Sequence, residues 1–360
     1  MTQTPQDPAQ WEAMRDVLSR VAVGPQGSKS LSRSEAAEAL GWVLSGDVSP
    51  IQAGIFLVAL RLKRETDEEN LGFLDALLAA STVEQAEVAD VVSFADPYDG
   101  FIRTPHYAPV AAAIVSTAGL PAYIHGSATL APKFGVTHRQ VFAAAGIQVP
   151  VGGGASATRE ACARLASEGV AYLGVEDFCP GLSALDDLRR EIAKRPFLAT
   201  LEKLITPLRG KERTHVVSSW VHRGYEDLLV LLLRDLGIDS VLLVRGREGH
   251  VDPHVHRDTD TLGYGLDGAA NDEVVQPKCY GTLLPKGPGD VDITPESLAA
   301  LWDEALHPKL RTHPGQTVRL LAGLTLCRAG VASTTMRGVG LAHKAIVSGE
   351  ARRALERFAG

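Results

Sequence analysis

Residues 96–138 read DPYDGFIRTPHYAPVAAAIVSTAGLPAYIHGSATLAPKFGVTH, an apolar helix candidate between two turns rich in glycine, proline and histidine. Apolar runs typical of strands, Val88 to Phe94 and Ala122 to Ile124, precede the two turns. An order of strand, turn, helix, strand and turn predicts a parallel sheet, and ligands bind such sheets beyond the carboxyl ends of the strands. Backbone amides at helix starts carry partial positive charge, so both turns are candidate contacts for a phosphate group.

The alternation of strands and helices continues along the chain. Thr214 to Val221 and Ser240 to Val244 are further strand candidates, and the segment from Tyr225 to Leu236 predicts a helix that crosses between them. We therefore expect residues 86–360 to form a large α/β domain with a mostly parallel central sheet.

The N-terminal part of the chain predicts only helices. Ser32 and Thr66 each stand three residues before a glutamate, which is the capping-box pattern, and Ser49 precedes a proline at a first helical position. Short helices of this kind need a further surface on which to pack. We expect a small helical domain over residues 13–85, joined in space by residues 165–200 and preceded by a disordered or loosely held tail, residues 1–12.

The overall charge is mildly acidic, with 36 Lys and Arg against 43 Asp and Glu. This balance argues against a protein covered in contacts to a nucleic-acid backbone. Residues 189–223 reverse the sign locally, with nine basic residues against three acids. A basic stretch of this kind is either a solvated helix face or a surface for an anionic ligand.

The spacing of the cysteines and the lengths of the apolar runs indicate in which cellular compartment the protein is expected. Cys162, Cys179, Cys279 and Cys327 lie far apart and form no CxxC pair, which favours reduced thiols over a zinc or disulfide framework. No signal-peptide pattern and no apolar run of about 18 residues occurs, so we expect a cytoplasmic protein without a membrane partner.

Several short motifs follow one another in a recognisable order. They are Asp99-Gly100, His125-Gly126, Lys133 with Gly135, and a predicted helix with Arg189-Arg190-Glu191 that is followed by ITPL. Together with the helical start, this order resembles glycosyltransferase family 3, specifically the anthranilate phosphoribosyltransferases. The resemblance covers most of the chain. It implies a fold of the nucleoside phosphorylase and phosphoribosyltransferase type and a homodimer formed through the helical domain.

The resemblance also implies a reaction and a set of contacts. Its enzymes bind phosphoribosyl pyrophosphate with magnesium and join the ribose to an aromatic amine in tryptophan synthesis. Carried over residue by residue, the acceptor contact is Arg189. The implied phosphate and sugar contacts are Asp99, Gly100, Thr104, His106, His125, Gly126, Lys133 and Gly135.

The groups that grip pyrophosphate in the family are largely replaced here. The GTGGDG turn reads ADPYDG (residues 95–100), the KHGNR strand end reads IHGSA (residues 124–128), and the acidic DE pair maps to Asp252 followed by Pro253. Glycines that would let backbone approach a ligand closely are thereby lost. We predict that phosphoribosyl transfer is changed or lost, with Mg²⁺ as cofactor if activity survives and no cofactor otherwise.

Two functions therefore stay open at the level of sequence. One is a transferase that acts on a phosphorylated sugar or another anionic small molecule. The other resembles a diverged branch of the family that lacks GTGGDG and is described as binding nucleic acid without catalysis; the segments RTP (residues 103–105) and RGREG (residues 245–249) are similar to it. This alternative implies binding of single-stranded nucleic acid by Arg189, Arg190, Lys203, Arg209, Lys211, Arg213 and Arg223.

One constellation lies outside the family pattern. His250, Asp252, His254 and His256 alternate, and on a strand they would share one face with enough ligands for zinc or a similar ion. Pro253 instead favours a polar surface loop. Both interpretations remain open.

Overall fold

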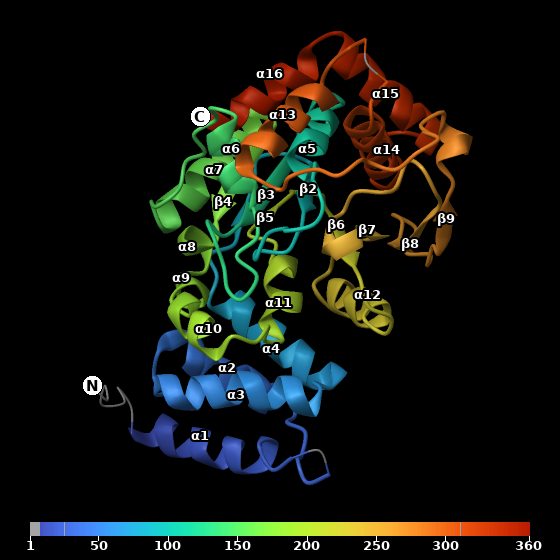
Figure 1. Cartoon of the computed structure of the whole chain (residues 1–360). Coiled ribbons are helices and arrows are strands. Elements are labelled where there is room, and N and C mark those ends of the chain that lie inside the picture. The colour runs from blue at the N-terminus through green and yellow to red at the C-terminus, as the bar shows by residue number, and fades with distance from the viewer. Residues whose placement is uncertain (1–7, 25, 310) are drawn as a thin grey trace.

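The computed structural model describes residues 8–24, 26–309 and 311–360 (Figure 1). A small helical domain at the N-terminal end packs under a large α/β domain with a mostly parallel sheet, as predicted. Among the described residues, no helix is long and apolar enough to cross a membrane.

The helical domain is built from two separate parts of the sequence. The first part supplies α1 (Pro8–Val21), α2 (Arg33–Ser45), α3 (Pro50–Lys63) and α4 (Asp67–Ala79). The second part supplies α8 (Val175–Phe178), α9 (Pro180–Ser183), α10 (Asp186–Ile192) and α11 (Leu198–Leu201). Helix α9 contacts α2, α10 contacts α3, and α11 contacts α4. Helix α1 already begins at Pro8, so the prediction of a loose tail is wrong for residues 8–12, and residues 1–7 lie outside the described residues.

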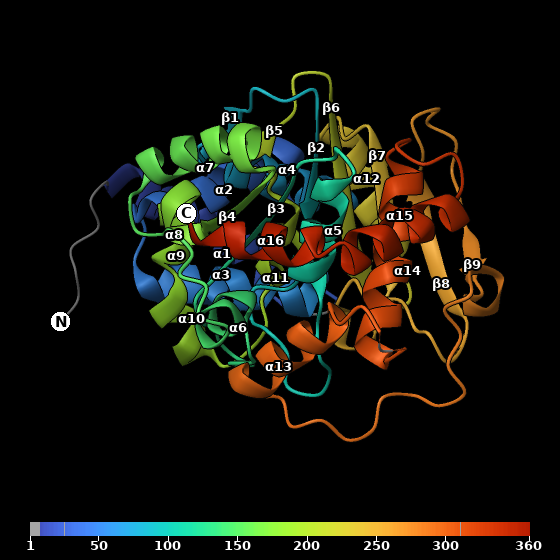
Figure 2. The same ribbon diagram turned by 90° about the horizontal axis from the view of Figure 1, so that it is seen from above.

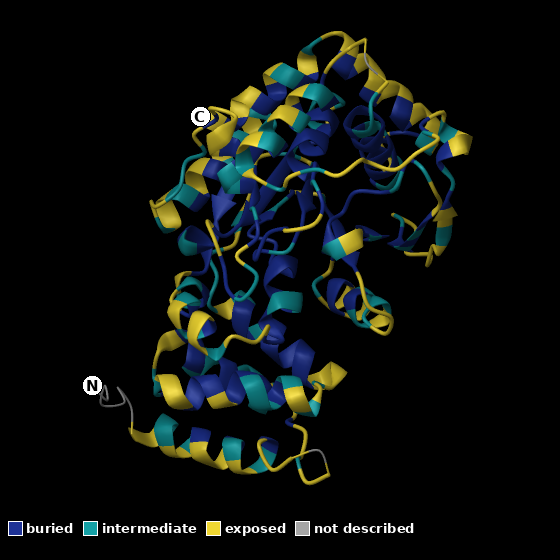
Figure 3. Ribbon diagram, viewed as in Figure 1, coloured by how far each residue is buried: buried dark blue, intermediate teal, exposed yellow. Residues whose placement is uncertain are grey.

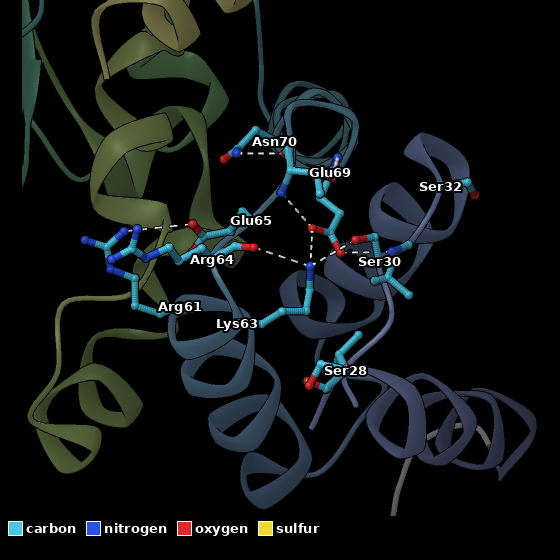
Figure 4. Close-up of polar contacts among 12 residues, drawn as sticks. Ser28, Ser30, Ser32, Arg61, Lys63, Arg64, Glu65, Glu69 and Asn70 are labelled. Carbon is cyan, nitrogen blue, oxygen red and sulfur yellow. Dashed lines mark hydrogen bonds and ion pairs between the residues drawn. The ribbon is translucent and has the colours of Figure 1, made fainter. Parts of the chain in front are cut away.

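The predicted capping boxes at Ser32 and Thr66 are formed, and Ser49, which was predicted as a helix start before Pro50, forms one as well with Gln52. The box at Thr66 does more than start a helix, because its partner Glu69 is completely buried. Glu69 accepts hydrogen bonds from the backbone N–H groups of Thr66 and Leu31, and its carboxylate lies 2.8 Å from Lys63 Nζ (Figure 4). One carboxylate therefore caps α4, holds the segment before α2 and neutralises the last residue of α3.

The central sheet has seven strands in the order β4-β3-β2-β6-β7-β8-β9. The strands are β2 (Asp90–Phe94), β3 (Ala122–Gly126), β4 (Val170–Gly174), β6 (Arg213–Trp220), β7 (Ser240–Arg245), β8 (Thr259–Tyr264) and β9 (Glu273–Val275). The parallel part consists of β4, β3, β2, β6 and β7, whereas β8 and β9 add antiparallel pairs at one edge. A separate parallel pair joins β1 (Glu84–Gln85) to β5 (Leu208–Arg209).

Adjacent residues of each central strand enter two different cores, as the two-residue period of a strand requires. Val91 and Val216 pack with the helical domain, whereas Val92 and Val217 pack with the C-terminal helices. Burial is continuous through both layers (Figure 3). Because both faces are covered, the central strands are apolar throughout, which explains why they could be recognised as short apolar runs.

The remaining helices cover the sheet, and the last four of them form the C-terminal part of the chain (Figure 2). The face opposite the helical domain carries α5 (Ala108–Thr117), α13 (Pro295–Ala305), α14 (His313–Arg328), α15 (Thr335–Val347) and α16 (Glu350–Glu356). Helix α12 (Glu226–Asp235) lies on the side of the helical domain and contacts α4. Helices α6 (His138–Ala144) and α7 (Ala155–Glu168) lie between β3 and β4 in the chain. The short 3-10 segments are η1 (Glu202–Leu204), η2 (Arg247–Gly249), η3 (Pro277–Tyr280) and η4 (Arg357–Ala359).

Candidate functional site

The candidate site lies at the carboxyl ends of β2, β3, β6 and β7, beside the helical domain. The turns after β2 and β3 pack directly on each other through a bridge between Phe101 and Val136. A Cβ on Gly100 would lie 2.4 Å from the Gly135 carbonyl oxygen, and one on Gly135 would lie 2.4 Å from the Phe101 nitrogen. The structure therefore uses these two predicted ligand contacts to bring one loop against the other.

Asp99 is buried and paired with two cations from different parts of the chain. Lys133 Nζ lies 3.5 Å from one carboxylate oxygen, and Arg195 Nε donates to the other at 3.0 Å. Arg195 lies between α10 and α11, so this pair joins the helical domain to the turn after β2. Lys133 also stands over the Phe101 ring, 5.1 Å from its centroid.

Glu248 fills a cradle of donors that the turn after β2 forms. Its carboxylate accepts hydrogen bonds from the backbone N–H groups of Ile102 and Arg103, each at 2.9 Å, and from the Thr104 hydroxyl at 3.1 Å. Lys133 Nζ lies 3.5 Å away. Burial disfavours ionisation, yet the Ile102 N–H, the Lys133 charge and the other donors together lower the pKa of Glu248. The cradle thus holds a carboxylate of the chain itself.

Asp252 occupies the start of α5 in a similar way. The N-cap residue Tyr107 offers no side-chain cap, and its N–H donates to Asp252 Oδ2 at 3.1 Å. Asp252 is 3% exposed, and its Oδ1 has no hydrogen-bond partner among the described residues. Burial, reinforced by the charge of Asp96, raises the pKa of Asp252 well above its ordinary value. The amide that an incoming anion would meet at this helix start is already used.

Two predicted histidine contacts are internal. The ring nitrogens of His125 are hydrogen bonded to the hydroxyls of Tyr98 and Ser93, and burial lowers the pKa of His125 to about 3. Its neighbour Gly126 ends β3 in ordinary packing, with the nearest atoms 3.8 Å from an added Cβ. His106 is completely buried, its two ring nitrogens have no hydrogen-bond partner among the described residues, and burial lowers its pKa well below the usual value.

Arg189, the predicted acceptor contact, is 1% exposed and forms an ion pair with Glu202. The other members of the basic stretch are dispersed over different surroundings. Lys211 pairs with Glu87, Arg213 with Asp90, and Arg190 stands over the Phe134 ring. Arg209 donates to the Leu236 carbonyl, Lys203 is buried, and Arg223 is exposed. These seven residues do not form one continuous basic face.

The structure places the four residues of the predicted metal site, His250, Asp252, His254 and His256, around one cavity. The segment is not a strand, because it bends between η2 and β8. His250 Nδ1 accepts from the Asp252 N–H, and Arg257 donates to His254 Nε2, so these two ring nitrogens already have partners within the chain. Across the described ranges of the chain, no group of three or more His, Cys, Asp or Glu residues could hold a metal ion.

A cavity of about 100 Å³ lies at the junction of the two domains. Cations line it from three elements, Arg61 of α3, Arg195 before α11 and Lys203 of η1, against the single carboxylate of Glu248. Trp220, Tyr225 and Leu229 supply its apolar wall. The sequence did not predict this cavity, although one signal was present: the charged pair Glu202 and Lys203 interrupts the apolar segment from Leu201 to Ile205.

The comparisons with known proteins agree with this architecture. Residues 15–81 match the helical bundle domain of the glycosyl transferase family. The anthranilate phosphoribosyltransferase of Geobacillus kaustophilus is 30% identical over 347 residues, covering 96% of this chain and 97% of the relative. An uncharacterised protein of Aquifex aeolicus is 28% identical over 88% of this chain and 93% of its own length.

Solved structures show the same fold. The anthranilate phosphoribosyltransferase of Thermus thermophilus superposes with a TM-score of 0.74 at 22% identity, over 96% of this chain and 98% of that one. The Saccharomyces cerevisiae enzyme, solved with PRPP (phosphoribosyl pyrophosphate) and Mg, gives 0.75 at 15% identity over 97% of both chains. Fold, helical bundle and full-length similarity therefore agree that the chain belongs to the anthranilate phosphoribosyltransferase family of the glycosyl transferases.

Proposed function

We propose that this member of the family does not carry out transfer from phosphoribosyl pyrophosphate, and that it acts on a small anionic molecule held in the junction cavity. The observation that supports the first part is the placement of Glu248 and Asp252. Each carboxylate takes up backbone amides at the carboxyl end of the sheet, where a phosphate group would need them. A pyrophosphate would have to displace these two side chains from the amides and would be repelled by negative charge on them.

The residues present also do not fit magnesium. Magnesium prefers octahedral oxygen coordination and is usually held by one or two carboxylates together with phosphates of the substrate. Both oxygens of Glu248 are committed to backbone and hydroxyl donors, and the raised pKa of Asp252 opposes a charged ligand there. The proposed function therefore includes no metal-dependent step.

The junction cavity supports the second part of the proposal. Three cations and one carboxylate line it, so its charge suits an anion, and its apolar wall favours an organic one. Its size of about 100 Å³ restricts the ligand to a few heavy atoms.

Calorimetry with phosphoribosyl pyrophosphate and magnesium chloride tests the first part. We expect no heat of binding at millimolar ligand for the wild-type protein. The variant Glu248→Ala frees the cradle and should gain measurable binding of pyrophosphate, whereas Glu38→Gln on the exposed face of α2 should not. Micromolar binding of phosphoribosyl pyrophosphate to the wild type would contradict the proposal.

Nucleic-acid binding is the competing function, and it needs a free basic face. Arg189, Lys211 and Arg213 are instead engaged by acidic residues. We expect no salt-dependent shift of single-stranded DNA. A shift at low salt that is weakened by charge reversal at Arg209 and Lys211 would favour this alternative.

A further inference from the structure

Lys203 reaches from the helical side of the molecule into the junction cavity. The residue is 5% exposed and lines the cavity wall. Its Nζ donates to the Ser219 carbonyl oxygen at 2.7 Å and lies 3.4 Å from the Ser219 hydroxyl, at the end of β6. The amine is therefore held at a fixed point, on a residue that lines the cavity.

Within the part of the chain that the structure describes, no carboxylate forms an ion pair with Lys203. A buried ammonium without such a partner is costly, and burial lowers the pKa of Lys203 to about 8. The charge of Arg195 acts in the same direction, whereas Asp96, Asp99 and Glu202 oppose the shift without cancelling it. About half of the side chains are consequently neutral amines near pH 8.

The surroundings also suggest which compounds would reach the amine. Arg61 donates to the Tyr225 hydroxyl at 2.6 Å, and this cation and Arg195 stand at the cavity wall where they attract a carboxylate. Trp220 and Leu229 add apolar surface to the cavity wall. A short molecule with an anionic end and an uncharged reactive end matches both features.

We propose that Lys203 is a nucleophile that forms an imine with a small carbonyl compound bearing a carboxylate. The lone pair of the neutral amine attacks the carbonyl carbon, a C–N bond forms, and the carbonyl electron pair moves to oxygen, which takes up a proton. Loss of water from this carbinolamine leaves the C=N bond, so one amine and one carbonyl give one imine and one water. Neither an oxidant nor a metal is required.

The proposal deepens the small-anion function above, since it uses the same cavity. A lysine that served only as a tether between η1 and β6 would need a hydrogen-bond donor and no reactive amine. Reaction with a carbonyl compound at this one side chain therefore separates a chemical role from a structural one.

Reductive trapping on the full chain tests the inference. The protein is incubated with glyoxylate or pyruvate and sodium cyanoborohydride at pH 8, which reduces an imine to a stable secondary amine, and labelled peptides are identified by mass spectrometry. We expect carboxymethylation of Lys203 by glyoxylate to be roughly tenfold faster than that of the exposed Lys211, because burial lowers the pKa of the Lys203 amine and its position is fixed in the cavity wall. The rate of labelling of Lys203 should fall at pH 6, where its amine is protonated.

The variant Lys203→Arg retains a cation and a donor but forms no imine, and it should abolish the specific label. Lys211→Arg is the matched control and should leave labelling of Lys203 unchanged. Thermal unfolding of both variants shows whether the fold is kept. Equal labelling of Lys203 and the surface lysines would overturn the inference. If glyoxylate then still binds by calorimetry, the small-anion function stands without the nucleophile; if it neither binds nor labels, both fall.

Discussion

Glu248 combines a left-handed backbone conformation, at φ 66°, with the densest set of hydrogen bonds at the candidate site. For a residue with a Cβ, that conformation costs about 1–2 kcal/mol. The donors of Ile102, Arg103 and Thr104 offset this cost and hold the side chain in place. The residue with the strained backbone is therefore the one whose carboxylate occupies the donors of the turn after β2. The negative charge of Glu248 strengthens these hydrogen bonds.

The charge of Glu248 makes a pH-dependent contribution that a variant can isolate. Its folded-state pKa is lowered from 4.5, so the stabilisation is present above about pH 4.5 and disappears as the pH falls through the lower, folded-state value. We expect Glu248→Gln to be less stable than wild type by about 1 kcal/mol at pH 7, and the difference to be smaller at pH 3. Urea unfolding at both pH values measures this. A difference that persists unchanged at pH 3 would contradict a role for the charge.

The ion pair of Arg189 and Glu202 is the most deeply buried one at the junction, with both side chains 1% exposed. Replacing one partner leaves the other as an uncompensated charge away from water. We expect Glu202→Gln to lower the free energy of unfolding by about 3–5 kcal/mol. Glu38→Gln, on an exposed helix face, serves as the control and should change it by less than about 0.5 kcal/mol. An equal effect of the two variants would show that Arg189 finds another partner.

At the scale of elements, helix starts were the most predictable features and pairing across the sequence the least. Ser32 and Thr66 cap helices through residues three positions away, so a short window of sequence contains the whole interaction. Asp99 and Lys133 were predicted as ligand contacts, but Lys133 pairs both with Asp99 and with Glu248, which lies more than a hundred residues further along. Sequence therefore identified them as ligand contacts, whereas folding satisfies them internally.

Strand β4 and the segment of residues 250–256 illustrate the same limit. Strand β4 is only Val170–Gly174 and was not recognised, because so short an apolar run also suits a helix. The alternating histidines suggested a strand, yet Pro253 cannot donate to a neighbouring strand, and the segment bends instead. The sequence pattern alone did not decide between strand and helix for β4, or between strand and loop for residues 250–256.

Helix α5 begins against the Asp252 carboxylate, and the two effects of that placement oppose each other. A negative charge at a helix start is favourable by about 0.3–1 kcal/mol, whereas burial of the charge raises the pKa of Asp252 well above its ordinary value. The raised folded-state pKa means that ionisation destabilises the fold at neutral pH, and protonation at lower pH removes this penalty.

We therefore expect Asp252→Asn, which keeps an acceptor for the Tyr107 N–H, to raise stability at pH 7 by about 1 kcal/mol. The gain in stability should vanish near pH 3, where the wild-type aspartate is protonated and therefore as uncharged as the asparagine of the variant. Denaturant unfolding across this range provides the measurement. A loss of stability at pH 7 would show that the helix start needs the negative charge.

At the scale of the whole molecule, the helical domain presents an apolar groove of about 640 Å³ lined by Val21, Ile55, Leu62 and neighbouring residues. Leu62 is 77% exposed and Ile51 on the same helix is 68% exposed. Apolar side chains gathered in this way favour an interface. We propose that a second copy of the chain covers the groove, as the family resemblance implies.

A charge in this groove should separate the copies. We expect Leu62→Asp to convert a dimer into a monomer in light scattering coupled to size-exclusion chromatography, with the fold retained because Leu62 contributes little to the core. Leu266→Asp, at a 43% exposed position after β8, is a control that should leave the assembly unchanged. A wild-type protein that is monomeric at micromolar concentration would refute the proposed dimer.

The bond between Arg195 and Asp99 has a consequence for motion. It joins the helical domain to the sheet, and Arg33 makes a second link by bridging Asp75 of α4 to Asp235 of α12. Two clamps on separate sides of the junction resist rotation of one domain against the other. Amide hydrogen exchange in the turns after β2 and β7 should accordingly be slow without any ligand, because the two domains are already held in one arrangement before a ligand binds.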